Sequence, residues 1–73
     1  MTNKNRLMGM IISQGYSQRT LAPAVGMSKN ALNLKINNKR TFKVDEIDRI
    51  CRVLNITDPA EKANIFLYSP SQK

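Results

Sequence analysis

The sequence predicts a small, compact all-α domain built from five helices. Apolar residues recur at helical spacing along the chain, and no stretch shows the sustained alternation that a β-strand requires. Serine or aspartate precedes three of the expected helices, and glycine or asparagine follows three of them, as is typical of helix caps. A chain of 73 residues holds one domain, which we expect over residues 1–68, with a flexible tail at residues 69–73.

Short-range signals predict where the helices begin and end. Gly15 and Gly26 can adopt the left-handed conformation that ends a helix, and Ser17 and Ser28 can cap the helices that follow. Helices are therefore expected over residues 3–14, 17–25, 28–36 and 58–68, with one more after the basic loop at residues 37–43.

The last two helices carry signals of their own. The helix after the loop has acids in its first turn, Asp45 and Glu46, where the helix dipole favours negative charge. Its apolar stripe comprises Ile47, Ile50, Cys51 and Leu54. The run Asp58-Pro59-Ala60-Glu61 indicates a cap, a proline at the first helical position and a capping-box acid.

Two residues disfavour the helices that contain them. Gly9 costs about 1 kcal/mol relative to alanine, which suggests a close helix contact at that point. Pro23 removes one backbone hydrogen bond, and its ring crowds the carbonyl of Arg19. The second helix is therefore expected to be kinked or loosened.

Positive charge is concentrated in the first part of the chain. The net charge is +7, and residues 1–44 contain eight lysines and arginines without an acid, whereas the remainder carries −1. Such a field attracts polyanions, and nucleic acid is the leading candidate for a chain of this size. A basic face that only keeps the protein soluble is the alternative.

The composition argues against several classes of protein. Without histidine, the single Cys51 supplies no zinc site and no internal disulfide, and the commonest general base is missing. We therefore expect no enzyme and no cofactor, with Cys51 as a buried apolar filler. The apolar stretches are too short for a bilayer span and no signal-peptide pattern precedes them, which predicts a cytoplasmic protein without membrane contact.

Residues 18–37 are the most informative segment, because they form two short helices joined through Gly26. Positive φ at this glycine sets the second helix steeply across the first, so that it can enter a major groove. Ala22 leaves room for the close crossing. Apolar residues suited to such a corner are Leu21, Val25, Met27 and Leu32.

These residues resemble the lambda-repressor-like helix-turn-helix family, which includes phage Cro and repressor DNA-binding domains and Xre-type regulators. The resemblance covers about residues 4–56 and is closest to small regulators from prophages of Gram-positive bacteria. Lys35 stands where many family members have an apolar residue, so we expect Ile36 to make the core contact. The motifs are Gly15-Tyr16-Ser17-Gln18, Leu21-Ala22, Val25-Gly26-Met27-Ser28, Leu32-Asn33-Leu34-Lys35-Ile36-Asn37, Lys39-Arg40 and the helix over residues 47–56.

The resemblance implies a sequence-specific DNA-binding transcription regulator of a phage genetic switch, with the helix at residues 28–37 in the major groove of double-stranded operator DNA. It implies base readout by Lys29, Asn30, Asn33 and Leu34. It implies phosphate contacts by Gln18, Arg19, Asn37, Lys39 and Arg40, with Gln18 also bracing the recognition helix. The alternatives are that Leu34 belongs to the core and that the polar residues are ordinary solvated positions.

Two further alternatives concern partners. Ile65, Phe66, Leu67 and Tyr68 cannot all face one core, and exposed members of this run are expected to form a homodimer or partner contact. The main rival function is an antirepressor, a modulator that binds the phage repressor protein through the same fold. The operator sequence, the sign of regulation and the oligomeric state do not follow from the sequence.

Overall fold

The computed structural model describes residues 1–67, which form five α-helices and no strand. The small all-α architecture expected from the sequence is confirmed. Tyr68 and the tail expected at residues 69–73 lie outside the described residues. The helices are α1 Lys4–Ser13, α2 Gln18–Ala24, α3 Lys29–Ile36, α4 Val44–Val53 and α5 Pro59–Phe66.

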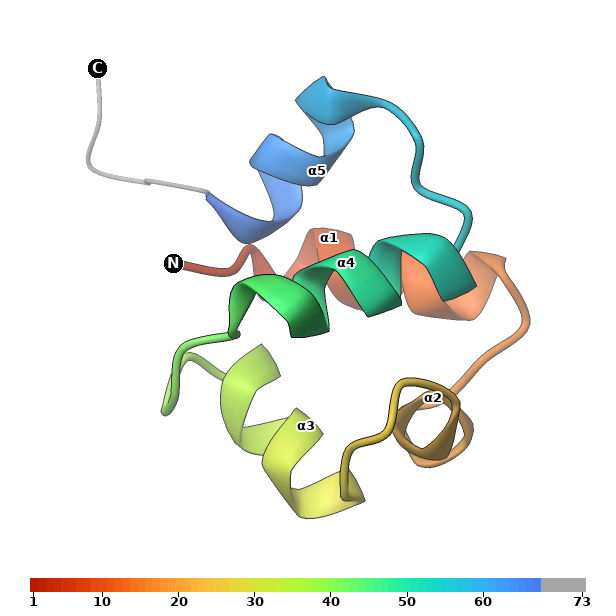
Figure 1. Cartoon of the computed structure of the whole chain (residues 1–73), viewed down its shortest axis with the longest axis vertical. Coiled ribbons are helices and arrows are strands. Elements are labelled where there is room, and N and C mark those ends of the chain that lie inside the picture. Colours follow the sequence, from red (N-terminus) through yellow and green to blue (C-terminus); the bar gives the residue numbers. More distant parts are fainter. Residues whose placement is uncertain (68–73) are drawn as a thin grey trace.

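The helices pack around α4, which crosses the middle of the molecule in front of α1 (Figure 1). In that view α5 lies on one side of α4, and α2 and α3 lie on the other. α2 packs directly against α3, and α1 packs against α5.

Side chains cap the start of four helices, as the sequence indicates for three of them. Asn3 Oδ1 accepts from the backbone N–H of Arg6 at 3.2 Å, ahead of α1. Ser17 and Ser28 cap α2 and α3 through their hydroxyl oxygens, and Asp58 Oδ1 caps α5. These side chains satisfy backbone N–H groups that have no partner inside the helix.

Left-handed residues end the helices. Gly15 and Gly26 have φ of +83° and +73°, so the two glycines occupy the turns predicted for them. Asn38 after α3 and Asn55 after α4 have φ of +62°, a conformation that asparagine tolerates better than most residues with a Cβ. The chain therefore changes direction after each of the first four helices.

The core collects apolar side chains from all five helices. Phe42 and Phe66 meet edge to face, with their ring centroids 5.5 Å apart. Cys51 is buried, as expected, and desolvation raises the pKa of its thiol. Ile36 is also fully buried, which confirms the core contact predicted for it. The largest fully buried side chains are Leu7, Ile11, Leu21, Val25, Leu32, Ile36, Ile50, Leu54 and Ile65.

The first residues are joined to two distant parts of the chain. The backbone N–H of Thr2 donates to Asn38 Oδ1 at 2.8 Å, and Asn38 Nδ2 donates back to the Thr2 carbonyl at 2.9 Å. The backbone N–H of Asn3 donates to the carbonyl of Ile65 at 2.7 Å. The segment before α1 thus connects the loop after α3 with the end of α5.

Some expectations for single residues were wrong. Gly9 is exposed and a Cβ there would meet nothing within 4 Å, so no helix packs closely against it. α2 continues through Pro23 to Ala24, with the proline in its last turn, and the kink or loosening expected there stays a prediction. The carboxylate of Glu61 bonds to the side chain of Arg6, in place of the capping-box contact.

A buried ion pair joins α3 to α4. Lys35 Nζ donates to both carboxylate oxygens of Glu46 at 2.7 Å, and each residue is only 8% exposed. Glu46 Oε1 also accepts from the backbone N–H of Lys43 at 2.8 Å. Burial alone raises the pKa of Glu46, but the hydrogen bonds from Lys35 and Lys43 outweigh it and leave that pKa below its usual value.

Leu32→Ala and Ile50→Ala are each expected to lower the free energy of unfolding by about 2 to 5 kcal/mol, because both side chains are fully buried. Urea unfolding followed by circular dichroism measures the change. Ile12→Ala, which truncates an exposed isoleucine on α1, is the matched control. An unaltered midpoint for either buried variant would contradict the core assignment.

Glu46→Gln is expected to lower the free energy of unfolding by about 3 kcal/mol at pH 7, because it leaves the buried ammonium of Lys35 without its counter-charge. The depressed pKa of Glu46 also means that its stabilisation is present above pH 4.5 and is lost as the pH falls through the lower folded-state pKa. The variant should therefore lose stability less steeply than the wild type below pH 4.5. Urea unfolding between pH 7 and pH 3 tests both statements.

The double variant Lys35→Met, Glu46→Leu is the control for that experiment. It removes both charges and is expected to keep most of the stability at pH 7, since apolar residues of similar volume often replace a buried ion pair without loss. Equal acid slopes in the wild type and in Glu46→Gln would show that the pair is not the source of the pH dependence.

Candidate nucleic-acid interface

The turn between α2 and α3 fixes how the two helices meet. The backbone N–H of Met27 donates to the carbonyl of Ala22 at 2.9 Å, and that of Gly26 donates to the carbonyl of Pro23 at 3.2 Å. Ala22 is 1% exposed, so its small side chain lies inside the packed corner. The start of α3 is thereby placed beside the start of α2.

Polar and basic side chains gather at this place. Lys29, Asn30 and Asn33 are exposed on α3 and line one shallow hollow. Lys29 and Asn33 also line a second hollow together with Gln18 and Arg19 of α2. We refer to these five residues as the polar cluster. The structure thus brings together three of the four residues predicted to read bases and two of those predicted to bind phosphate.

Gln18 is the centre of the cluster. Its Oε1 accepts from Asn33 Nδ2 at 3.1 Å, and its Nε2 donates to Met8 Sδ at 3.5 Å. Gln18 therefore connects α1, α2 and α3 through one side chain. The bond to Asn33 fixes the orientation of that amide on the exposed surface of α3.

The other predicted contacts lie away from the cluster. Lys39 and Arg40 are exposed in the loop after α3, where their backbone N–H groups both donate to the carbonyl of Leu34. Arg40 lines a different hollow, with Thr2. Asn37 Nδ2 donates to the carbonyl of Asn33 at 2.8 Å, so this side chain helps to end α3. Leu34 is half-buried. Its exposure is therefore intermediate between that of the core residue and that of the base-reading residue for which it was considered.

The acids of the chain face inward or neutralise neighbouring cations, which shapes the charge of the surface. Arg6 lowers the pKa of Glu61 through a hydrogen bond, and Arg49 does the same for Asp45. Lys62 pairs with Asp48 at 3.1 Å, and Asp58 serves as a helix cap. Within residues 1–67, the lysine and arginine side chains without an ion pair are Lys4, Arg19, Lys29, Lys39, Arg40, Lys43 and Arg52.

Three contributors to this region were not predicted from the sequence. Lys35 departs from the pattern of the helix-turn-helix family that the sequence resembles, but its partner Glu46 lies on the next helix and nothing local indicates the pairing. Met8 reaches Gln18 from α1. Arg49 reaches the end of α2 from α4. A lysine on the same stripe as Leu32 and Ile36 was the one available signal that a buried acid lay opposite.

A second surface lies between α4 and α5. Val44 and Leu67 are 76% and 72% exposed, and with Ile47, Ala63 and Phe66 they line an apolar hollow of about 240 Å³, which we call the α4/α5 groove. Ile65 is fully buried and Phe66 is 5% exposed, so the core takes up two residues of the run expected to contact a partner. Leu67 is the described member of that run that remains exposed.

No three histidine, cysteine, aspartate or glutamate side chains of residues 1–67 lie close enough together to hold a metal ion. No helix within that range is long and apolar enough to cross a membrane.

The chain belongs to the family described as Protein of unknown function (DUF739), which matches residues 2–69. A comparison with curated proteins gives no match. The family description assigns no activity, so the chemistry of the surface has to carry the functional argument.

The α4/α5 groove leads to a prediction about self-association. Phe66→Glu is expected to unfold the chain, because it places a carboxylate in the core. Leu67→Glu is expected to leave the fold intact and to shift any dimer toward monomer. Sedimentation equilibrium with circular dichroism separates the two effects. An unchanged oligomer in a folded Leu67→Glu variant would remove the groove as the dimer contact.

Proposed function

We propose that this protein is a sequence-specific DNA-binding transcription regulator in which α2 and α3 act as a helix-turn-helix of the lambda-repressor-like type. The observation that carries the proposal is the polar cluster, in which Lys29 and Asn30 begin α3 and Asn33, in the middle of that helix, is held by Gln18. The start of a recognition helix is the part that meets base edges in the major groove. The unpaired cations of the first 44 residues supply the positive field that such a surface needs.

Asn33 has the hydrogen-bonding groups that adenine requires. One N–H of its Nδ2 is engaged by Gln18 Oε1, which leaves the second N–H and Oδ1. Adenine offers N7 as an acceptor and N6–H as a donor in the major groove, and an asparagine amide matches this pair. Lys29 and Asn30 extend the same exposed surface and can donate to guanine or adenine acceptors.

Phosphate contacts would come from the sides of this surface. Arg19 lines the same hollow as Lys29 and can reach a phosphate beside the recognition helix. Lys39 and Arg40 are exposed after α3 and can hold the backbone further along the groove. Gln18 retains a second N–H on Nε2, which can donate to a phosphate oxygen while Oε1 accepts from Asn33. These contacts position the protein without specifying sequence.

A homodimer on a two-fold symmetric operator completes the proposal. Two copies would place their α3 helices in successive major grooves, about one turn of DNA apart. The α4/α5 groove, with Leu67 exposed beside it, is the apolar surface available for that contact. It shares no residue with the polar cluster, so dimerisation and DNA binding do not compete for the same side chains.

A second candidate function is an antirepressor that binds the phage repressor protein. The observation in its favour is that Ala31 and Leu34 are half-buried on α3, so their exposed portions could meet an apolar partner beside the polar cluster. Repressor capture that depends on Leu34, without specific DNA binding, is its expected signature.

Selection from a random duplex DNA library tests the proposal. Purified protein should enrich one sequence motif at low salt, and a phage repressor protein is added in a parallel arm. Enrichment of a motif without repressor supports the regulator. Absence of any motif, together with repressor capture that is lost in Leu34→Ala, overturns the regulator in favour of the antirepressor.

Variants of reading and positioning residues are expected to behave differently on the selected site. Asn33→Ala should weaken binding by about 1 to 3 kcal/mol on that site, with much less loss on random DNA, because Asn33 is proposed to contact a base. Lys39→Gln should weaken binding to both DNAs alike and reduce the salt slope by about one. Fluorescence anisotropy across a salt series gives both quantities. Equal losses for Asn33→Ala on the two DNAs would exclude base readout by this residue.

A further inference from the structure

Arg49 reaches from α4 to the end of α2. Its Nη1 donates to the carbonyl of Val25 at 3.0 Å, and Val25 is the C-cap residue of α2. The last carbonyls of a helix have no partner within it, and a cation at that end also interacts favourably with the helix dipole. Arg49 therefore supplies from outside the bond that the end of α2 lacks.

The guanidinium of Arg49 is held in place from its own helix. Nη2 donates to Asp45 Oδ2 at 2.6 Å, and Nε donates to the Asp45 carbonyl at 3.4 Å. A planar guanidinium can direct several N–H groups at once, whereas the single ammonium of lysine cannot reproduce this fork. The direction of the bond to Val25 is thereby set by the first turn of α4.

The turn after α2 lies directly against the guanidinium of Arg49. A Cβ on Gly26 would lie 2.9 Å from Arg49 Nη1, and the φ of +73° at Gly26 is one that a residue with a side chain rarely adopts. Gly26 is required for its backbone conformation, and its lack of a Cβ also lets the guanidinium approach closely. The turn and Arg49 thus fit against each other.

We propose that Arg49 is a positioning residue for the DNA-binding surface: by holding the turn at residues 25–28, it sets the direction in which α3 leaves α2. The inference rests on the proposed function. The other end of α3 is held by the bond from Lys35 to Glu46, one turn before Arg49 on α4. α4 therefore makes polar contacts with the turn that precedes α3 and with Lys35 near the end of α3.

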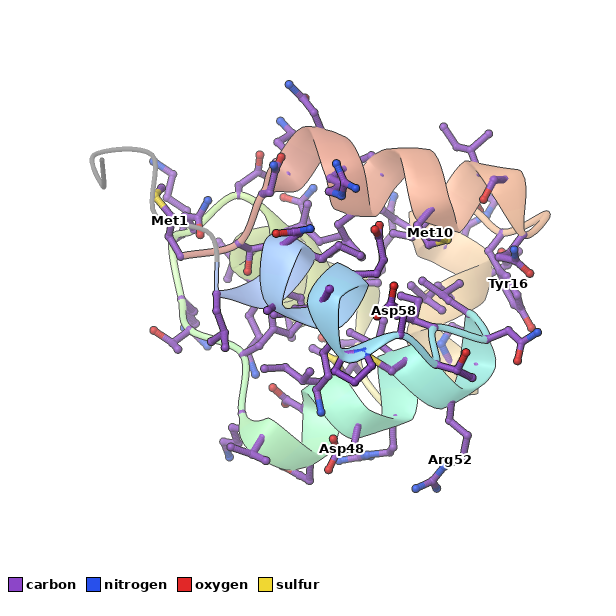
Figure 2. The ribbon with its side chains drawn as sticks, turned by 90° about the horizontal axis from the view of Figure 1, so that it is seen from above. Met1, Met10, Tyr16, Asp48, Arg52 and Asp58 are labelled. Atoms are coloured by element: carbon purple, nitrogen blue, oxygen red, sulfur yellow. The ribbon has the colours of Figure 1, made fainter. Side chains whose placement is uncertain are left out.

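Arg49→Lys and Arg49→Gln test this role, with Arg52→Gln as the matched control. Arg52 lies on the same helix, points away from the other helices (Figure 2) and forms no ion pair within residues 1–67. Arg49→Lys keeps the positive charge but loses the planar guanidinium, whose separate N–H groups bond to Val25 and Asp45 at the same time. Asp45→Asn keeps Arg49 but removes the carboxylate that orients its guanidinium, so it is a second way to weaken the bond from Arg49 to Val25. Thermal unfolding confirms that each variant is folded.

Two readouts are measured. Without DNA, amide exchange at Gly26 and Met27 is expected to accelerate about tenfold in Arg49→Lys and Arg49→Gln, and to stay unchanged in Arg52→Gln. With DNA, the ratio of affinities for the selected site and for random DNA is expected to fall about tenfold in Arg49→Lys, while the salt slope stays at the wild-type value.

Each result supports or overturns the inference. Wild-type exchange in both Arg49 variants would show that Arg49 does not hold the turn. Faster exchange with an unchanged affinity ratio would remove its role in recognition. A salt slope reduced by about one in Arg49→Gln but not in Arg49→Lys, with the ratio unchanged, would make Arg49 a phosphate contact. If the wild type selects no DNA motif, the proposed function fails, whereas the exchange data still decide whether Arg49 holds the turn.

Discussion

The bond between Lys35 and Glu46 is the contact on which the relation between α3 and α4 depends. Both groups are buried, so neither charge could remain there without the other. The Glu46 carboxylate also accepts from the backbone N–H of Lys43. It therefore binds residues on both sides of the loop at residues 37–43: Lys35 shortly before the loop and Lys43 at its end. The exposed cations Lys39 and Arg40 are presented from a loop whose ends are fixed.

The arrangement of acids explains how a chain with five carboxylates presents a positive surface. Four of them pair with a lysine or arginine, and the other caps α5. Two of these pairs neutralise cations of the first 44 residues, Arg6 at the surface and Lys35 in the interior. Lys29 and Arg19 remain unpaired beside Asn33. Structural stability and the proposed polyanion contact thus use different cations.

The sequence predicted the parts of the structure that depend on near neighbours. Caps such as Ser17 and Ser28 and turns such as Gly26 act within a few residues, and the helix bounds follow from them. Contacts between residues that are distant in sequence could not be predicted in this way. Lys35 and Glu46 are 11 residues apart and Val25 and Arg49 are 24 residues apart, and no local signal indicates either pairing. The close packing suggested at Gly9 also depended on a distant contact, and that suggestion was wrong. The clustering of Gln18 with Asn33 was expected only through the family resemblance.

The hydrogen bonds of Thr2 and Asn3 bear on the order in which the chain can fold during synthesis. Their partners are Asn38 and the carbonyl of Ile65, so the bonds of Thr2 and Asn3 are complete only after the residues of α5 have been made. Chain elongation at about 5 to 20 residues per second places the synthesis of Ile65 about 3 to 12 seconds after that of Asn3. A nascent chain released from the ribosomal tunnel only as far as α4 would hold its apolar α1 surface uncovered, and we expect full protection from proteolysis to arise only after α5 emerges.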